Sequence, residues 1–133
     1  MKKINSKEGI FFWITGLAGS GKSSIARSLF SKINKSFGPS IIVSGDNIRN
    51  IYGFRKYTKN DRLRFAKTKL KFCELILRQK INLVYSTISM LNKVRNMNKK
   101  KFSNYIEIYI KTDLEKIVKI NKKKLYSRKK MKN

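Results

Sequence analysis

The sequence predicts an α/β fold in which a parallel sheet of about four strands carries helices on both faces. Residues 9–15 form a run of aromatic and β-branched side chains that ends in a glycine-rich turn, as a buried strand does. Residues 23–33 then repeat apolar side chains at helical spacing. Strand-like and helix-like segments alternate along the rest of the chain. This pattern is typical of a parallel sheet whose ligands bind at the carboxyl ends of the strands.

The first half of the chain contains two such pairs of strand and helix. A turn around Gly38 and Pro39 follows the first helix and precedes a short strand over residues 41–43. That strand ends at Ser44, and the next helix is expected to begin near Asp46. Because the carboxyl ends of parallel strands lie at one edge of the sheet, Asp46 is expected beside the glycine-rich turn.

The second half of the chain begins with a long helix. Apolar residues between positions 61 and 79 recur every three or four residues, which predicts an amphipathic helix with a strongly basic outer face. Residues 82–88 and 105–110 are predicted to form the third and fourth strands, followed by helices over 90–102 and 113–120. The apolar spacing of the long helix is made by Leu63, Ala66, Leu70, Cys73, Ile76 and Leu77.

The composition predicts one basic domain over residues 1–133. The chain has 33 Lys and Arg against 7 Asp and Glu, and the formal net charge of +26 favours polyanions as partners. Three interpretations stay open: compositional drift in an AT-rich gene, a preference for anionic nucleotides, and nucleic-acid binding. No motif that reads nucleic acid is present, so a specific nucleic-acid partner is not expected. Residues 121–133 form a lysine-rich tail.

Cysteine content and hydropathy point to the cytoplasm. Cys73 is the only cysteine, so the chain cannot form an internal disulfide framework or a cysteine-based metal site. The apolar run over residues 10–14 is too short for the core of a signal peptide, and no stretch reaches membrane-spanning length. We therefore expect a cytoplasmic protein without a membrane partner.

The glycine-rich turn has the composition of a phosphate-binding loop. Small residues allow successive backbone N–H groups to converge on a phosphate, and the following helix adds its positive N-terminal end. Lys22 is expected to reach the β- and γ-phosphates of ATP, and the Ser23 hydroxyl to coordinate Mg²⁺. The alternative is a turn that matches by chance. The predicted ATP-binding residues are Gly16, Leu17, Ala18, Gly19, Ser20, Gly21, Lys22, Ser23 and Ser24.

Phosphoryl transfer also needs an acidic group near the metal and the attacking hydroxyl. Asp46 is the best candidate, as a second magnesium-site residue and as a catalytic group, although Asp is also a favoured helix N-cap. Arg49 lies one turn further along the same helix face and could bind an anionic substrate. The alternative for Arg49 is an ordinary solvated charge.

Together these segments resemble the adenylylsulfate kinase family. The strand and phosphate loop from Phe12 to Ala26 look like the family's opening. Ser44-Gly45-Asp46-Asn47-Ile48-Arg49 resembles its Asp-Gly-Asp-x-x-Arg segment. Tyr57-Thr58 and Asp61-Arg62 resemble the family's Phe-Ser-x-x-Asp-Arg stretch. Ile88-Ser89 resembles the Ile-Ser that ends its third strand, and Lys123-Lys124-Leu125-Tyr126 resembles the Lys-Gly-Leu-Tyr of its mobile lid.

The resemblance implies transfer of the γ-phosphoryl group of ATP to a ribose hydroxyl of an anionic nucleotide, with adenylylsulfate as the leading acceptor. It also implies a possible homodimer. Ser89 matches a position assigned to a phosphoserine intermediate, although direct in-line transfer needs none. The resemblance makes Lys22, Asp46 and Ser89 catalytic. The substrate-binding residues that it implies are Arg49, Tyr57, Arg62, Ile88, Lys123 and Leu125.

Several positions depart from the family pattern. Ser44 replaces its first acid, Phe65 stands where the family has an asparagine, and Lys124 replaces the lid glycine. Residues 86–92 and 104–110 are instead similar to a relative that phosphorylates cytidine diphosphoramidate. In that relative a methionine follows the Ile-Ser, as Met90 follows Ile88-Ser89 here. The cytidine compound is therefore the second candidate acceptor.

The chain stops soon after the lid segment, and the sheet is expected to lack the family's usual C-terminal end. Three states stay open: an intact short kinase, a truncated remnant and a fragment of a longer gene. A non-catalytic nucleotide-binding remnant and a basic nucleic-acid-binding protein are the competing functions. The aromatic residues Phe11, Phe12, Trp13 and Phe30 favour a core over a platform for stacking bases.

Overall fold

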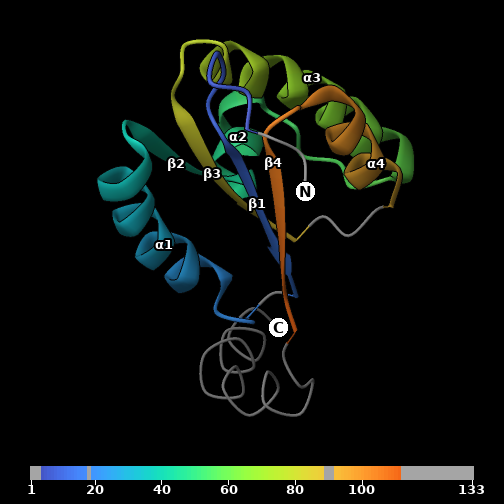
Figure 1. The fold of residues 1–133 in the computed structure, drawn as a ribbon. Helices are drawn as coiled ribbons and strands as arrows, with labels where there is room; N and C mark the ends of the chain where they lie inside the picture. Colours follow the sequence, from blue (N-terminus) through green and yellow to red (C-terminus); the bar gives the residue numbers. More distant parts are fainter. Residues whose placement is uncertain (1–3, 18, 89–91, 112–133) are drawn as a thin grey trace.

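The computed structural model describes residues 4–17, 19–88 and 92–111. Its centre is a four-stranded parallel sheet in the order β2-β3-β1-β4 (Figure 1). The predicted α/β fold class is confirmed. In chain order the elements are β1 (Phe11–Gly16), α1 (Lys22–Phe37), β2 (Ser40–Ser44), α2 (Gly45–Tyr52), α3 (Lys59–Leu77), β3 (Asn82–Thr87), α4 (Asn92–Lys101) and β4 (Tyr105–Ile110).

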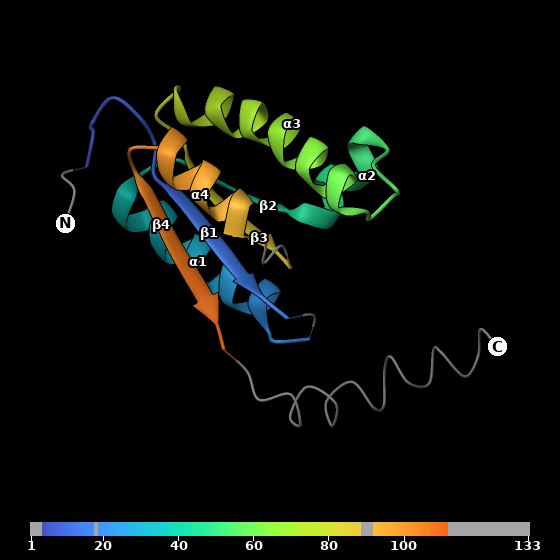
Figure 2. The same ribbon diagram turned by 90° about the vertical axis from the view of Figure 1, so that its right-hand side faces the viewer.

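Helices cover both faces of the sheet, as Figure 2 shows with α1 on one side and α3 and α4 on the other. On the α1 side, Ala26 and Ile33 pack with Phe12 and Ile14 of β1. On the opposite side, the residues that alternate with these in β1 enter a larger core, which includes Trp13. Both clusters are apolar, so burial of the two sheet faces stabilises the layered arrangement.

The strand register brings three strand ends together. Thr15 of β1 is opposite Thr87 of β3, and Ser44 of β2 is opposite Ser86 of β3. Since all pairs are parallel, the phosphate loop after β1 and the start of α2 after β2 lie at the same edge of the sheet. This edge holds the predicted site.

The predicted elements recur with shifted ends. The first helix begins at Lys22 and continues to Phe37, four residues beyond its predicted end at residue 33. Lys59–Leu77 replaces the predicted 61–79 because Thr58 caps the helix two residues earlier. The helix predicted over residues 113–120 lies outside the described residues.

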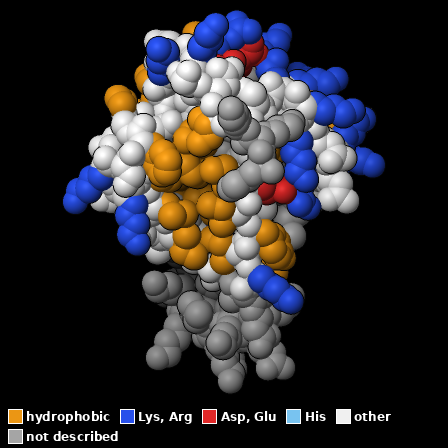
Figure 3. Space-filling model, in the orientation of Figure 1, with side chains coloured by type: hydrophobic (Ala, Val, Ile, Leu, Met, Phe, Trp, Pro, Cys, Tyr) orange, Lys and Arg blue, Asp and Glu red, His pale blue; other side chains and the backbone are white. Residues whose placement is uncertain are grey.

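The surface is basic at its periphery and apolar beside β4. Figure 3 shows Lys and Arg side chains around the rim and an apolar area between α1 and β4. Ile108 and Ile110 of β4 pack against the α1-side core but are only partly buried, and Ile106 is 42% exposed. Among the described helices, none is long and apolar enough to cross a membrane.

Candidate active site at the carboxyl edge of the sheet

The phosphate loop links β1 to α1 through two glycines in the left-handed region. Gly19 has φ 81° and Gly21 has φ 88°, values that other residues adopt only with strain. The backbone N–H of Ser20 donates to the carbonyl of Leu17 at 3.0 Å and closes the turn. Helix α1 begins at Lys22, so its N-terminal end is directed at the loop. This geometry suits a bound phosphate.

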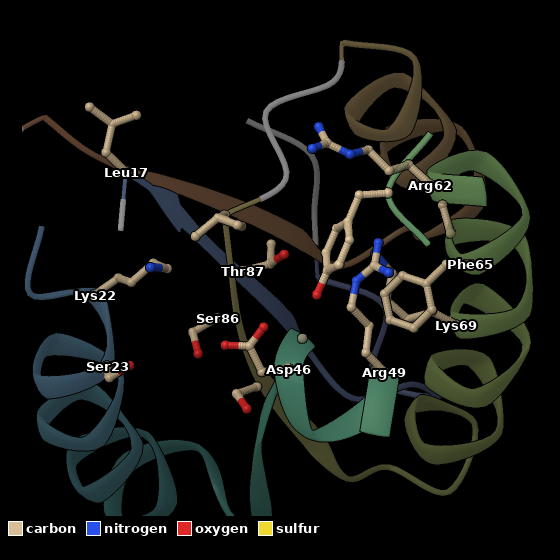
Figure 4. A pocket seen from close by; sticks show the side chains of 15 residues that line it. Leu17, Lys22, Ser23, Asp46, Arg49, Arg62, Phe65, Lys69, Ser86 and Thr87 are labelled. Carbon is tan, nitrogen blue, oxygen red and sulfur yellow. The ribbon is translucent and has the colours of Figure 1, made fainter. Parts of the chain in front are cut away.

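Lys22 and Asp46 enter the site from different helices. Figure 4 shows Lys22 projecting from α1 and Asp46 from α2 toward the space between them. Burial lowers the pKa of Lys22, and the nearby Asp46 carboxylate partly offsets that effect. The lysine and the acid therefore interact electrostatically across the site, as phosphate binding and proton transfer at one place require.

Ser44 caps helix α2. Its hydroxyl accepts a hydrogen bond from the backbone N–H of Asn47 at 3.2 Å. The alternative in which Asp46 is the N-cap is wrong, because the cap lies two residues earlier. Asp46 instead occupies the first turn of α2, where its negative charge also interacts favourably with the helix dipole.

Arg49 is held in place by its neighbours. Its Nη1 donates to the carbonyl oxygens of Phe54 at 3.4 Å and Lys56 at 3.2 Å. The guanidinium carbon lies 4.3 Å from the ring centroid of Tyr57 and 4.6 Å from that of Phe65. The side chain of Arg49 is half-buried and is thus positioned by its neighbours. Ring contacts of this kind leave the outer N–H groups of an arginine able to bind an anion.

Arg62 reaches the same site from the first turn of α3. Thr58 caps this helix by accepting from the backbone N–H of Asp61 at 3.1 Å, and its hydroxyl donates to the Asp61 carboxylate. In Figure 4 Arg62 lies on the same side of the pocket as Arg49 and Phe65, across from Lys22. The two arginines thus come from separate helices but serve one pocket.

A pocket of about 300 Å³ joins these side chains. Among the described residues, four cationic side chains and one carboxylate line it, so its charge suits an anionic ligand such as a nucleotide. The lining residues are Leu17, Lys22, Ser23, Ser44, Gly45, Asp46, Arg49, Tyr57, Arg62, Phe65, Ala66, Lys69, Ser86, Thr87 and Ile88.

The family pattern described as adenylylsulphate kinase matches residues 8–133. The chain belongs to this family. A cytidine diphosphoramidate kinase of Campylobacter jejuni is 35% identical over 116 residues, which cover 87% of this chain and 68% of the relative. A probable adenylyl-sulfate kinase of Aeropyrum pernix is 30% identical over 127 residues, covering 92% of this chain and 69% of the relative.

A solved structure agrees in fold. The APS kinase of Mycobacterium tuberculosis in complex with AMPPNP and APS superposes with a TM-score of 0.78 at 25% identity, covering 91% of this chain and 73% of that one. The chain is accordingly a phosphotransferase of the adenylylsulphate kinase family.

Sequence reasoning missed Lys69 in this family member. The other basic residues of α3 are exposed, as predicted, but Lys69 is only 1% exposed and lines the pocket. A signal was available: Lys69 lies four residues after Phe65, three after Ala66 and four before Cys73, all three of them buried. That spacing places it on the apolar face of the helix.

The donor set of the kinase fits a magnesium ion. Mg²⁺ prefers oxygen ligands and is commonly held by one or two protein groups together with substrate phosphates. The Ser23 hydroxyl and the Asp46 carboxylate line the same pocket and offer that set. Within the described residues, no cluster of three or more His, Cys, Asp or Glu could hold a metal without such help.

Some predicted residues are not placed in the pocket. Gly16 ends β1, whereas Gly19, Ser20, Gly21 and Ser24 belong to the loop and the first turn of α1. None of these residues lines the pocket. Tyr57 and Ile88 do line it, and Ile88 is 50% exposed. The predicted residues outside the described ones are Ala18, Ser89, Lys123 and Leu125.

Proposed function

We propose that this protein is an ATP-dependent kinase that transfers the γ-phosphoryl group to a ribose hydroxyl of an anionic nucleotide. One observation carries the proposal: the phosphate-loop lysine Lys22, the acid Asp46 and the cations Arg49 and Arg62 line a single pocket. The phosphate loop takes ATP, and the two arginines take the phosphate of the acceptor.

The transfer is an in-line displacement. The ribose oxygen forms a bond to the γ-phosphorus while the bond from this phosphorus to the β,γ-bridging oxygen breaks, and ADP leaves. Asp46 accepts the proton of the hydroxyl, and Lys22 stabilises negative charge on the transferring group. Mg²⁺, held by Ser23 and Asp46 with the phosphates of ATP, supplies further charge neutralisation when bound. Ser89 takes no covalent part in this route.

Adenylyl sulfate and cytidine diphosphoramidate are the two candidate acceptors. Family membership and the relative from Aeropyrum pernix support adenylyl sulfate. The 35% identity to the Campylobacter jejuni kinase supports the cytidine compound. So does Phe65, because an aromatic ring cannot make the amide hydrogen bonds of an asparagine, and a lost polar contact can cost several orders of magnitude in discrimination.

Turnover assays test both the kinase activity and the identity of the acceptor. ADP release and a mass increase of one phosphoryl group on the acceptor are expected with at least one nucleotide. A ratio of kcat/KM values that favours one nucleotide identifies the acceptor. Failure with both, although ATP still binds, would favour a non-catalytic nucleotide-binding protein.

Cys73 and the need for ATP bear on the cellular compartment of the enzyme. Burial raises the pKa of the Cys73 thiol to about 12, so this cysteine stays protonated and unreactive. We infer a reducing cytoplasm, where ATP is supplied, and the possible homodimer stays a prediction.

A further inference from the structure

Lys69 is a buried lysine at the floor of the pocket. Its Nζ lies 4.1 Å from the ring centroid of Trp13, 5.0 Å from that of Tyr85 and 5.6 Å from that of Phe65. Figure 4 shows Lys69 beside Phe65 on α3. Within residues 4–17, 19–88 and 92–111, no acidic side chain forms an ion pair with it. A buried cation without a counter-ion carries a desolvation cost that a bound anion would offset.

Two more polar groups lie at the same place. Trp13 and Tyr85 stack with centroids 5.1 Å apart, and in the described part of the chain neither Trp13 Nε1 nor Tyr85 Oη has a hydrogen-bond partner. Tyr85 Oη lies 3.5 Å from the position that a Cβ on Gly45 would take, and Gly45 lines the pocket. Buried polar groups are nearly always paired, so unpaired ones beside a pocket point to a ligand.

Arg49 adds a second positive charge next to Lys69. Both cations contact the same Phe65 ring, at 4.6 Å for the guanidinium carbon and 5.6 Å for Nζ. Their repulsion is reduced when an anion binds near both. The floor of the pocket therefore favours a ligand group that is negatively charged and accepts hydrogen bonds.

We propose that Lys69 is a specificity-determining residue of the acceptor site, and that its ammonium group binds the terminal oxyanion of the acceptor nucleotide. This inference rests on the proposed function. Arg49 and Arg62 bind the phosphate that both candidate nucleotides share, and Lys69 binds the group beyond it, a sulfate or a phosphoramidate. Hydrogen bonds to charged groups contribute enough binding energy to separate nucleotides with this group from those without it.

The charge of Lys69 makes acceptor binding depend on pH. Burial lowers the pKa of Lys69 to about 7, with Cys73 opposing this shift and Arg49 adding to it. Burial raises the pKa values of Cys73 and Tyr85, which also face Lys69, so neither of these groups titrates near pH 7. A bound oxyanion raises the pKa of Lys69 again, so binding above about pH 7 is accompanied by proton uptake.

Calorimetric titration of the full chain tests the proposal. The ligands are adenylyl sulfate, cytidine diphosphoramidate, and the monophosphates AMP and CMP, which lack the terminal group. At about pH 6, Lys69→Met is expected to weaken binding of the true acceptor about ten- to a hundredfold and to leave the matching monophosphate unchanged. Lys71→Met, at an exposed position of the same helix, is expected to change neither.

Proton uptake separates a ligand contact from a structural role. At about pH 8, titrations in buffers of different ionisation enthalpy should show proton uptake by the unmodified protein and none by Lys69→Met. The nucleotide that shows both effects identifies the terminal group as sulfate or phosphoramidate. Unchanged AMPPNP binding by Lys69→Met would show that the variant is folded.

Three results would overturn the inference. Equal weakening of full nucleotides and monophosphates would assign Lys69 a structural role. Unchanged acceptor affinity in Lys69→Met, with normal binding by the unmodified protein, would refute the inference alone. Binding of neither nucleotide by the unmodified protein would reject the proposed function together with it.

Discussion

The hydroxyl of Ser44 accepts a hydrogen bond from the backbone N–H of Asn47 at 3.2 Å and thereby caps helix α2. The N-cap role that could have explained Asp46 is therefore filled by another residue. Asp46 lines the pocket and influences the pKa of Lys22. Stability and catalysis are thus assigned to different side chains within one turn, which makes them separable by mutation.

Replacing the acid should remove activity and spare the fold. Asp46→Asn keeps the size of the side chain but cannot accept the proton of the ribose hydroxyl. We expect kcat to fall by about a hundredfold or more, while the free energy of unfolding changes by less than about 0.5 kcal/mol. A coupled assay of ADP release measures kcat, and urea denaturation measures the free energy of unfolding.

Replacing the N-cap residue of α2, unlike replacing Asp46, should lower the stability of the protein. Ser44→Ala leaves the N–H of Asn47 without its partner and is expected to lower the free energy of unfolding by about 1 kcal/mol. Urea denaturation of Ser44→Ala and Asp46→Asn under the same conditions compares their free energies of unfolding. If Asp46→Asn were the more destabilising variant, the division of roles between these residues would be wrong.

Lys22 should be needed for phosphoryl transfer and should contribute little to the stability of the fold. Because Lys22→Ala removes the cation that faces the transferring phosphoryl group, turnover is expected to fall by about a hundredfold or more. Arg27→Ala, at an exposed position of the same helix, serves as the matched control and should keep full activity. Substantial turnover by Lys22→Ala would reject the phosphate-loop assignment.

Arg49 should not be replaceable by lysine. Arg49→Lys keeps the charge but loses the flat contact with Tyr57 and Phe65 and the hydrogen bonds to the carbonyls of Phe54 and Lys56. The KM for the acceptor is expected to rise about tenfold with the KM for ATP unchanged.

Steady-state kinetics with each substrate varied in turn give both constants of Arg49→Lys. Arg64→Lys, at an exposed position of α3, is the control. An equal rise in both KM values would mean that Arg49 supports the fold of the whole site rather than the acceptor.

The net charge of +26 predicts weak polynucleotide binding of a particular kind. Such binding arises from counterion release at phosphates, so it should be independent of sequence and fall about a thousandfold between about 50 and about 200 mM salt. Fluorescence anisotropy with labelled oligonucleotides of different sequence measures it. Selective binding that persists at the higher salt would revive the nucleic-acid hypothesis.

The sequence predicted the parts of the site that local pattern determines. A glycine-rich loop between strand and helix has few possible conformations, and Asp46 follows a strand directly, so its place at the sheet edge follows from topology. The surroundings of Arg49 and Lys69 could not be predicted in the same way. They depend on rings from separate elements, Tyr57, Phe65 and Trp13, that meet only after the chain has folded.

The burial of Lys69 on α3 shows the same limit. Charged residues on an amphipathic helix usually face water, whereas the spacing of Lys69 places it on the buried face. Aromatic faces with negative potential permit the exception, because they interact favourably with the ammonium group. A sequence pattern does not reveal which rings will be in reach.

The pH dependence of folding provides a test of Lys69 that needs no substrate. In the folded protein its pKa is lowered to about 7, whereas the ordinary value is 10.5. Between these values the unfolded chain binds one more proton than the folded chain, so raising the pH favours folding. Compared with Lys69→Met, the unmodified protein should gain about 1.4 kcal/mol in free energy of unfolding per pH unit above about pH 7.

Urea denaturation at about pH 7, 8 and 9 measures this difference, and subtracting the Lys69→Met profile removes the contribution of every other titrating group. Below about pH 7 the two profiles should run parallel, because Lys69 is then protonated in both states. Lys71→Met should follow the unmodified protein throughout, since Lys71 is exposed. Parallel profiles up to about pH 9 would mean that Lys69 keeps its ordinary pKa, and they would refute the lowering of its pKa by burial.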